Sequence, residues 1–219
     1  MLIEFRVENY KCFRDETVFS MIAGKGKENE KCLLDAAGFK HRLLKSAVIY
    51  GANASGKTKL LEAMEQMCDM VRHSSTKYTS GDKLPYYPYK FRFDTEKSPS
   101  SFEISFITKN NTRYRYGFSA NETTITGEWL FQGNKRGETL LFERDDQKFN
   151  IKDKIKRKKI LQEMTRENAL FISTSAQLNE PICMDVVEWF KEFQTFTDDS
   201  IPPFAISLLS KDDKFRNTV

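Results

Sequence analysis

The sequence predicts an α/β fold with some α+β character, in which an α/β core carries an antiparallel β subdomain. The core is indicated by a short apolar run that leads into a glycine-rich loop and then into residues with helical periodicity. The subdomain is indicated by a change of the hydrophobic period to two after residue 85. We therefore divide the chain into a core over 1–85, an antiparallel subdomain over 86–151 and a helical segment over 152–219.

Length and composition restrict the class of protein. The chain has 219 residues, of which 39% are hydrophobic and 30% charged, which fits a folded domain and argues against disorder. The net charge of +4 is small, and we interpret it as too evenly spread to indicate nucleic acid by itself. The start lacks a signal-peptide pattern, no apolar run approaches the ~20 residues of a membrane span, and the four cysteines lack zinc-site spacing. We expect a cytoplasmic protein with reduced thiols.

The first part of the core begins with a predicted antiparallel pair of strands. Ile3, Phe5 and Val7 alternate with charged residues, and Thr17–Ile22 follows after a turn. The apolar run Ala47–Tyr50 is typical of a strand buried on both faces in a parallel sheet.

The helix after the glycine-rich loop and the meander have clear patterns. Apolar residues fall at helical spacing from Leu60 to Val71. Apolar side chains then alternate with polar ones over four or five predicted strands, separated by Asn- and Gly-rich turns. The alternating positions are Phe91, Phe93, Phe102, Ile104, Phe106, Tyr114, Tyr116, Phe118, Ile125, Trp129, Phe131, Leu140 and Phe142. We interpret these aromatic stripes as packing surface rather than as a base-stacking platform.

The last segment begins with a lysine-rich run over 152–159, which we interpret as a solvated helix face, although it could touch phosphates. A short apolar strand is predicted at Ala169–Ile172, followed by a polar loop, and a helix is predicted at Ile182–Phe193.

The glycine-rich loop carries the most specific motif. It matches the pattern G-x-x-x-x-G-K-[ST] at every fixed position through Gly51, Ala52, Asn53, Ala54, Ser55, Gly56, Lys57 and Thr58. The glycines let successive backbone N–H groups surround phosphates, and the N-terminus of the following helix faces the same anion. Lys57 would contact the β- and γ-phosphates, and the Thr58 hydroxyl would coordinate Mg²⁺. The sequence thus predicts a P-loop protein that binds a nucleoside triphosphate, with ATP and Mg²⁺ expected.

Several segments resemble one class of P-loop protein. The opening Leu2–Phe13 and the Asn53 variant of the loop are similar to ABC-type ATPase heads of the SMC/RecF/OLD superclass. More narrowly, the chain resembles prokaryotic AAA-domain ATP-binding proteins of the RloA and AbiLi abortive-infection type. The matching segments are Leu44–Lys57, Tyr114–Phe118, Glu128–Leu130, Leu141–Arg144 and Asn168–Phe171.

This resemblance implies an ABC-ATPase-like core lobe beside an antiparallel β subdomain. It implies a Q-loop glutamine that follows a strand and touches Mg²⁺ and the hydrolytic water, and Gln177 is the matching position. It also implies that Lys11 and Cys12 approach the nucleotide. The partners implied are a second copy of the head, forming a homodimer over ATP, and an effector nuclease or toxin. The setting implied is phage defence or DNA transactions.

Some motifs of such an ATPase do not occur after Gln177, namely a signature motif, an acidic pair ending a Walker B strand and a switch histidine. The apolar run Phe204–Leu209 is followed by Ser210 and Lys211 instead of acids. We therefore expect a truncated ATPase, its N-terminal half, that binds the nucleotide without hydrolysing it unaided. A regulatory binding module without turnover stays open as an alternative, and a small-substrate P-loop kinase is less favoured. A GTPase is disfavoured because Asn134–Gly137 lacks the aspartate of N-K-x-D.

Overall fold

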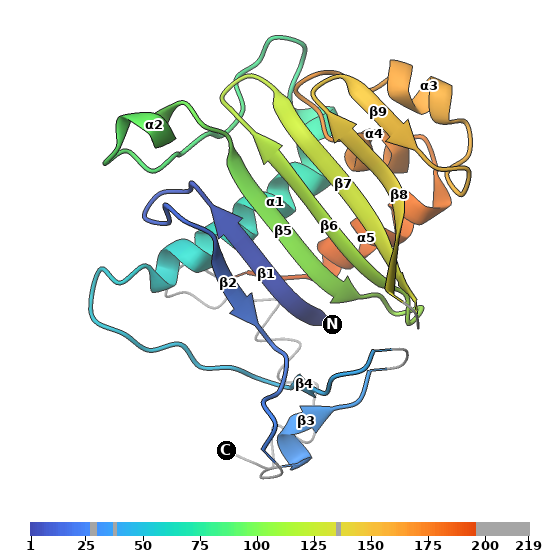
Figure 1. Ribbon diagram of the computed structural model, residues 1–219. Helices are drawn as coiled ribbons and strands as arrows, with labels where there is room; N and C mark the ends of the chain where they lie inside the picture. The colour runs from blue at the N-terminus through green and yellow to red at the C-terminus, as the bar shows by residue number, and fades with distance from the viewer. Residues whose placement is uncertain (27–29, 37–38, 135–136, 196–219) are drawn as a thin grey trace, which may run out of the picture.

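The computed structural model describes residues 1–26, 30–36, 39–134 and 137–195. Its largest element is a seven-stranded sheet in which every pairing between neighbours is antiparallel (Figure 1). In spatial order, the strands are β2 (Thr17–Ser20), β1 (Leu2–Glu8), β5 (Ser100–Ile107), β6 (Arg113–Ala120), β7 (Ile125–Asn134), β8 (Gly137–Asp145) and β9 (Lys148–Ile151). A small two-stranded sheet pairs β3 (Leu33–Leu34) with β4 (Leu43–Leu44) and follows a 3₁₀ turn at Glu30–Cys32.

Three helices pack against one face of the large sheet, and two shorter ones lie at its periphery (Figure 1). The packed helices are α1 (Lys57–Lys77), α4 (Phe171–Gln177) and α5 (Pro181–Glu192), and the peripheral ones are α2 (Phe93–Glu96) and α3 (Lys158–Glu163). The helices predicted around Leu60–Val71 and Ile182–Phe193 are therefore confirmed. Pro181 at the first position of α5 and the Glu180 carboxylate, which accepts from the Cys183 N–H at 2.9 Å, explain where that helix begins.

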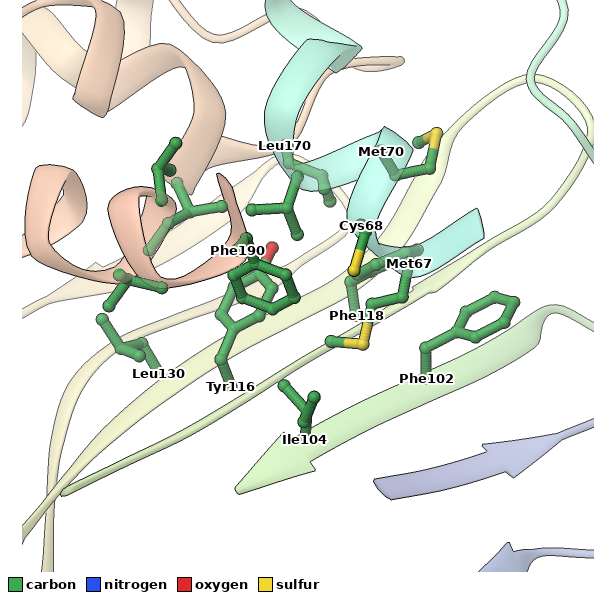
Figure 2. Close-up of a cluster of buried hydrophobic side chains, with 14 of the residues drawn as sticks. Met67, Cys68, Met70, Phe102, Ile104, Tyr116, Phe118, Leu130, Leu170 and Phe190 are labelled. Atoms are coloured by element: carbon green, nitrogen blue, oxygen red, sulfur yellow. The ribbon is translucent and has the colours of Figure 1, made fainter. Parts of the chain in front are cut away.

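The alternation along the meander decides which side chains enter the core. On β5, Phe102, Ile104 and Phe106 are each at most 1% exposed. Figure 2 shows Phe102 and Ile104 on the side of the sheet where Met67 of α1 lies, and Phe106 stacks on Trp189 of α5 with ring centres 4.2 Å apart. The interpretation of the aromatic stripes as packing surface is confirmed on β5 and β6, whereas Trp129 and Phe131 on β7 lie on the other face, beside Glu103 and Arg115. Intervening residues carry ion pairs, for example Arg115 with Glu103 at 2.8 Å. The sheet consequently has one buried face and one charged face.

The N-terminal hairpin and the meander form a single sheet, because β1 pairs with β5 from Leu2↔Phe106 to Glu8↔Ser101. The strand pairing predicted within residues 1–22 is confirmed, since β1 also pairs with β2. The division of the chain at residues 85 and 151 stays a prediction, and the sheet runs across the first of these boundaries.

Three predicted strands are wrong. Ala47–Tyr50 lies in neither sheet, and Val48 is 73% and Tyr50 86% exposed, because no strand among the described residues pairs with it. Phe91 and Phe93 do not extend the meander: both are exposed, and Phe93 begins α2. The run Ala169–Ile172 instead leads into α4, where buried residues follow one another without strand alternation. The run Phe204–Leu209 lies outside the described residues.

Candidate functional site

The glycine-rich loop is a tight backbone turn that ends at the start of α1. Gly56 has φ of +94° and is the cap of α1, so a residue without a Cβ suits this position. Gly51 lies close to the other end of the loop, since a Cβ there would be 2.8 Å from the Ser55 hydroxyl oxygen. Ala54 also has a positive φ, of 64°. The two motif glycines thus allow the loop to fold back on itself.

The Lys57 side chain lies within this turn. Its Nζ donates hydrogen bonds to the carbonyl oxygens of Gly51 and Ala52, both at 2.8 Å, and reaches Ser55 Oγ at 3.4 Å. The loop from Gly51 to Ser55 is exposed to solvent. The ammonium group is therefore already held against the loop, in contact with acceptors that an anion could replace.

The start of α1 adds a partial positive charge. The helix has 21 residues, its cap supplies no side-chain hydrogen bond, and its first turn contains no acidic residue. The first N–H groups of a helix lack intrahelical partners, and the helix dipole favours an anion there. Thr58, at the second helical position, is exposed beside the same N–H groups. Loop, Lys57, Thr58 and helix start together form a site suited to phosphate groups.

The turn after β1 packs directly against the loop. A Cβ on Gly56 would lie 3.1 Å from Cys12 Sγ and 3.5 Å from the Phe13 ring. The turn also borders an open hollow of about 390 Å³ lined by residues that include Cys12, Phe13 and Tyr89. Cys12 and Phe13 thus lie next to Gly56 of the loop and also line the hollow.

Lys11, at the tip of the same turn, contacts the side of α1. Its Nζ forms an ion pair with Glu62 and lies 5.1 Å from the centre of the Tyr87 ring. Glu62 also pairs with Lys59 at 2.7 Å. Hydrogen bonds from Lys11 and Lys59 lower the pKa of the Glu62 carboxyl. Lys11 thus lies on the turn that contacts the loop, and its charge is balanced by Glu62, while its approach to a nucleotide stays a prediction.

Gln177 is placed far from the loop. It is the last residue of α4 and lines a cavity of about 260 Å³ together with Arg72 and Lys191, among others. Arg72 follows Lys57 by fifteen residues in α1, a rise of about 22 Å. The strand predicted before Gln177 is a helix instead. The structure therefore brings Lys11, Cys12 and the loop together, and it does not bring Gln177 to them.

A buried polar network lies beneath the start of α4, and no sequence motif singles it out. Glu128 on β7 is fully buried and accepts hydrogen bonds from the N–H groups of Phe171 at 2.6 Å and Ile172 at 2.9 Å, and from the Tyr116 hydroxyl at 3.0 Å. It thereby caps the N-terminus of α4. Burial raises the pKa of the Glu128 carboxyl, and Arg144 and these donors oppose that rise.

Arg144 on β8 completes this network. Its Nη1 lies 3.8 Å from the Glu128 carboxylate and donates to the Ala169 carbonyl at 2.8 Å, while its Nε donates to the Asp146 carbonyl at 2.6 Å. In the sequence, only the family resemblance points to this network, because Glu128, Arg144 and Asn168–Phe171 all lie in the segments that carry it. Those segments are far apart in the sequence and meet in one cluster.

A comparison with known protein families agrees with the P-loop motif at Gly51–Thr58. A protein-family model described as "AAA domain, putative AbiEii toxin, Type IV TA system" matches residues 46–217. A search among curated proteins gave no match. Within the described residues, no helix combines the length and apolar character needed to cross a membrane.

Proposed function

Because this chain belongs to the AAA-domain family of that model, a family of P-loop ATPase type, we propose that it binds ATP together with Mg²⁺ at the loop Gly51–Thr58. The observation that carries the proposal is the position of Lys57 Nζ, 2.8 Å from two carbonyl oxygens of its own loop. An ammonium group held at the centre of a glycine-dependent turn can exchange these acceptors for phosphate oxygens with little rearrangement.

The roles of the individual residues follow from their places. Backbone N–H groups from Gly51 to Thr58 would surround the phosphates, and Lys57 would contribute a full positive charge to them. The Thr58 hydroxyl, exposed at the second position of α1, would be a ligand of Mg²⁺. The hollow beside Cys12 and Phe13 adjoins the loop and would admit the nucleoside, while Lys11 lies within reach of the same region.

The finer assignment is also a proposal. The segments that resemble RloA- and AbiLi-type proteins support an ABC- or SMC-like head that acts as a homodimer with an effector nuclease or toxin in phage defence. Three of those segments supply Glu128, Arg144 and the chain that begins α4, which supports a shared fold beyond the loop.

A second candidate is a regulatory nucleotide-binding module without turnover. The observation that favours it is the position of Gln177, which lines a cavity with Arg72, about 22 Å along α1 from Lys57, since hydrolysis needs a group that positions water beside the phosphates. A measurement of phosphate release from Mg-ATP separates the two candidates. Turnover by the 219-residue chain would contradict the second.

The substitution Lys57→Ala tests the site itself. Loss of a charge-assisted hydrogen-bonding group costs about 1.5–3 kcal/mol, so the affinity for Mg-ATP should fall at least about tenfold in isothermal titration calorimetry. Lys77→Ala, which removes an exposed lysine from the opposite end of α1, is the matched control and should leave the affinity unchanged. Equal affinities of the wild type and Lys57→Ala would sink the proposal.

A further inference from the structure

The segment over 152–159 concentrates the positive charge of the chain. It contains six lysine or arginine residues and one acid, a net charge of +5. Because the whole chain carries +4, all other residues together sum to −1. The interpretation of an evenly spread charge is therefore wrong, and this surface is the main source of positive potential.

The fold holds this segment in a defined position between β9 and α3. Ile155 is 1% exposed and belongs to the core, while its neighbours on both sides are exposed. The Lys152 N–H donates to the Leu141 carbonyl at 2.8 Å, and Arg157 Nη2 donates to the Leu178 carbonyl at 2.6 Å. These contacts hold the backbone of the segment in place. A ligand that binds the lysines would therefore cause a smaller loss of conformational entropy than it would in a free segment.

Few acids neutralise these cations. Asp153 pairs with Lys158 at 2.7 Å, whereas the side-chain partner of Lys152 is the neutral Asn150 and that of Lys154 is the neutral Gln132. In the described part of the chain, Lys156 and Lys159 form no side-chain hydrogen bond or ion pair. A solvated charged face normally mixes both signs and forms pairs along it. The surface of 152–159 contains a single acid, so most of its positive charge is not neutralised by neighbouring acids. This excess of positive charge favours a polyanionic partner.

The surface is separate from the nucleotide loop. The loop packs against the turn after β1, whereas the basic segment follows β9 at the far edge of the sheet (Figure 1). Five strand spacings separate β1 from β9, which is about 24 Å. A shallow hollow of about 310 Å³, lined in part by Lys158, Lys159 and Asn150, provides room for a phosphate group next to the cations.

We propose that the basic surface 152–159 binds the phosphate backbone of a nucleic acid duplex without reading its sequence. Lysines act as point charges toward phosphates, and several of them on one surface can neutralise neighbouring phosphates of a duplex. An interfacial membrane helix is disfavoured, because α3 has only six residues and its Leu161 is buried.

The test measures binding of the full chain to a fluorescein-labelled DNA duplex of about 20 base pairs by anisotropy, between 50 and 200 mM salt. The triple variant Lys154→Gln, Lys156→Gln, Lys159→Gln should bind at least tenfold more weakly at 50 mM salt. The slope of log affinity against log salt should fall by about 0.9 for each phosphate that the variant no longer neutralises. The matched control Lys83→Gln, Lys90→Gln, Lys97→Gln removes three exposed lysines elsewhere and should bind like the wild type.

Several results would overturn the proposal. They are no duplex binding by the wild type at 50 mM salt, or an equal loss of affinity in the triple variant and in its control. Binding to phosphatidylserine vesicles in place of the duplex would assign the surface to a membrane. Binding to poly-glutamate as tight as to the duplex would leave no preference for nucleic acid. Lys57→Ala should retain duplex binding, and a loss there equal to that of the triple variant would move the site to the nucleotide loop.

Discussion

Lys57 and Glu128 carry opposite charges in opposite surroundings. Lys57 begins α1 at the end of an exposed loop and is itself partly buried, and among the described residues its side-chain hydrogen bonds all go to that loop. Glu128 is fully buried, and its partners come from β6, β8 and the start of α4. The Lys57 charge is therefore accessible from solvent, whereas the Glu128 charge is compensated entirely by groups within the fold.

The energetics of the two regions should differ accordingly. An exposed charge retains its hydration and contributes little to stability, so it can be removed at small cost. A buried charge is tolerated only while its partners compensate its lost hydration. Function should therefore be sensitive at the loop and stability at the network.

The largest effect is expected for Glu128→Ala. The change leaves Arg144 as an uncompensated buried charge and removes the acceptors of the Phe171 and Ile172 N–H groups, so the free energy of unfolding should fall by about 3–5 kcal/mol. Urea unfolding followed by circular dichroism measures it. Glu143→Ala, an exposed neighbour on β8, should change stability by less than about 0.5 kcal/mol. A decrease below about 1 kcal/mol in Glu128→Ala would contradict the comparison.

A smaller effect on stability, with an effect on binding, is expected for Gly56→Ala. An alanine at φ of +94° is strained by about 1–2 kcal/mol, and its Cβ would approach Cys12 Sγ. Gly81→Ala is the control, since Gly81 has φ of +87° with open space around it. Both variants should lose stability in urea unfolding, and only Gly56→Ala should also lose Mg-ATP affinity in calorimetry. Equal affinities in the two variants would show that the loop geometry is not needed.

The smallest effect concerns pH and the ion pairs of Glu62. Lys11 and Lys59 hold the pKa of Glu62 below its ordinary value of 4.5, so the carboxylate stabilises the fold above that value. This contribution, under about 1 kcal/mol for such partly exposed pairs, is lost as the pH falls through the folded-state pKa. The difference in Tm between wild type and Glu62→Gln should therefore be constant near pH 7 and shrink below pH 4.5. A difference that grows on acidification would refute the assignment.

The predictions that were confirmed depend on local pattern. The helix after the loop follows from apolar residues at helical spacing, and the meander strands follow from alternation, because each pattern fixes one buried face. The predictions that were wrong concern short apolar runs. In Ala47–Tyr50 and in Ala169–Ile172, four apolar residues follow one another without alternation. Periodicity therefore cannot tell whether such a run is a strand, a helix or a loop.

The sequence by itself determined the loop motif from Gly51 to Thr58, the helix that follows it and the alternating strands. Each of these depends on the conformational limits of single residues and on periodicity along the chain. Only the tertiary structure decided that Gln177 ends a helix far from Lys57, that Ala47–Tyr50 has no strand neighbour among the described residues, and that Glu128 meets Arg144 beneath α4. These outcomes depend on contacts between residues distant in the sequence, and local propensity carries no information about which distant groups will compensate a buried charge.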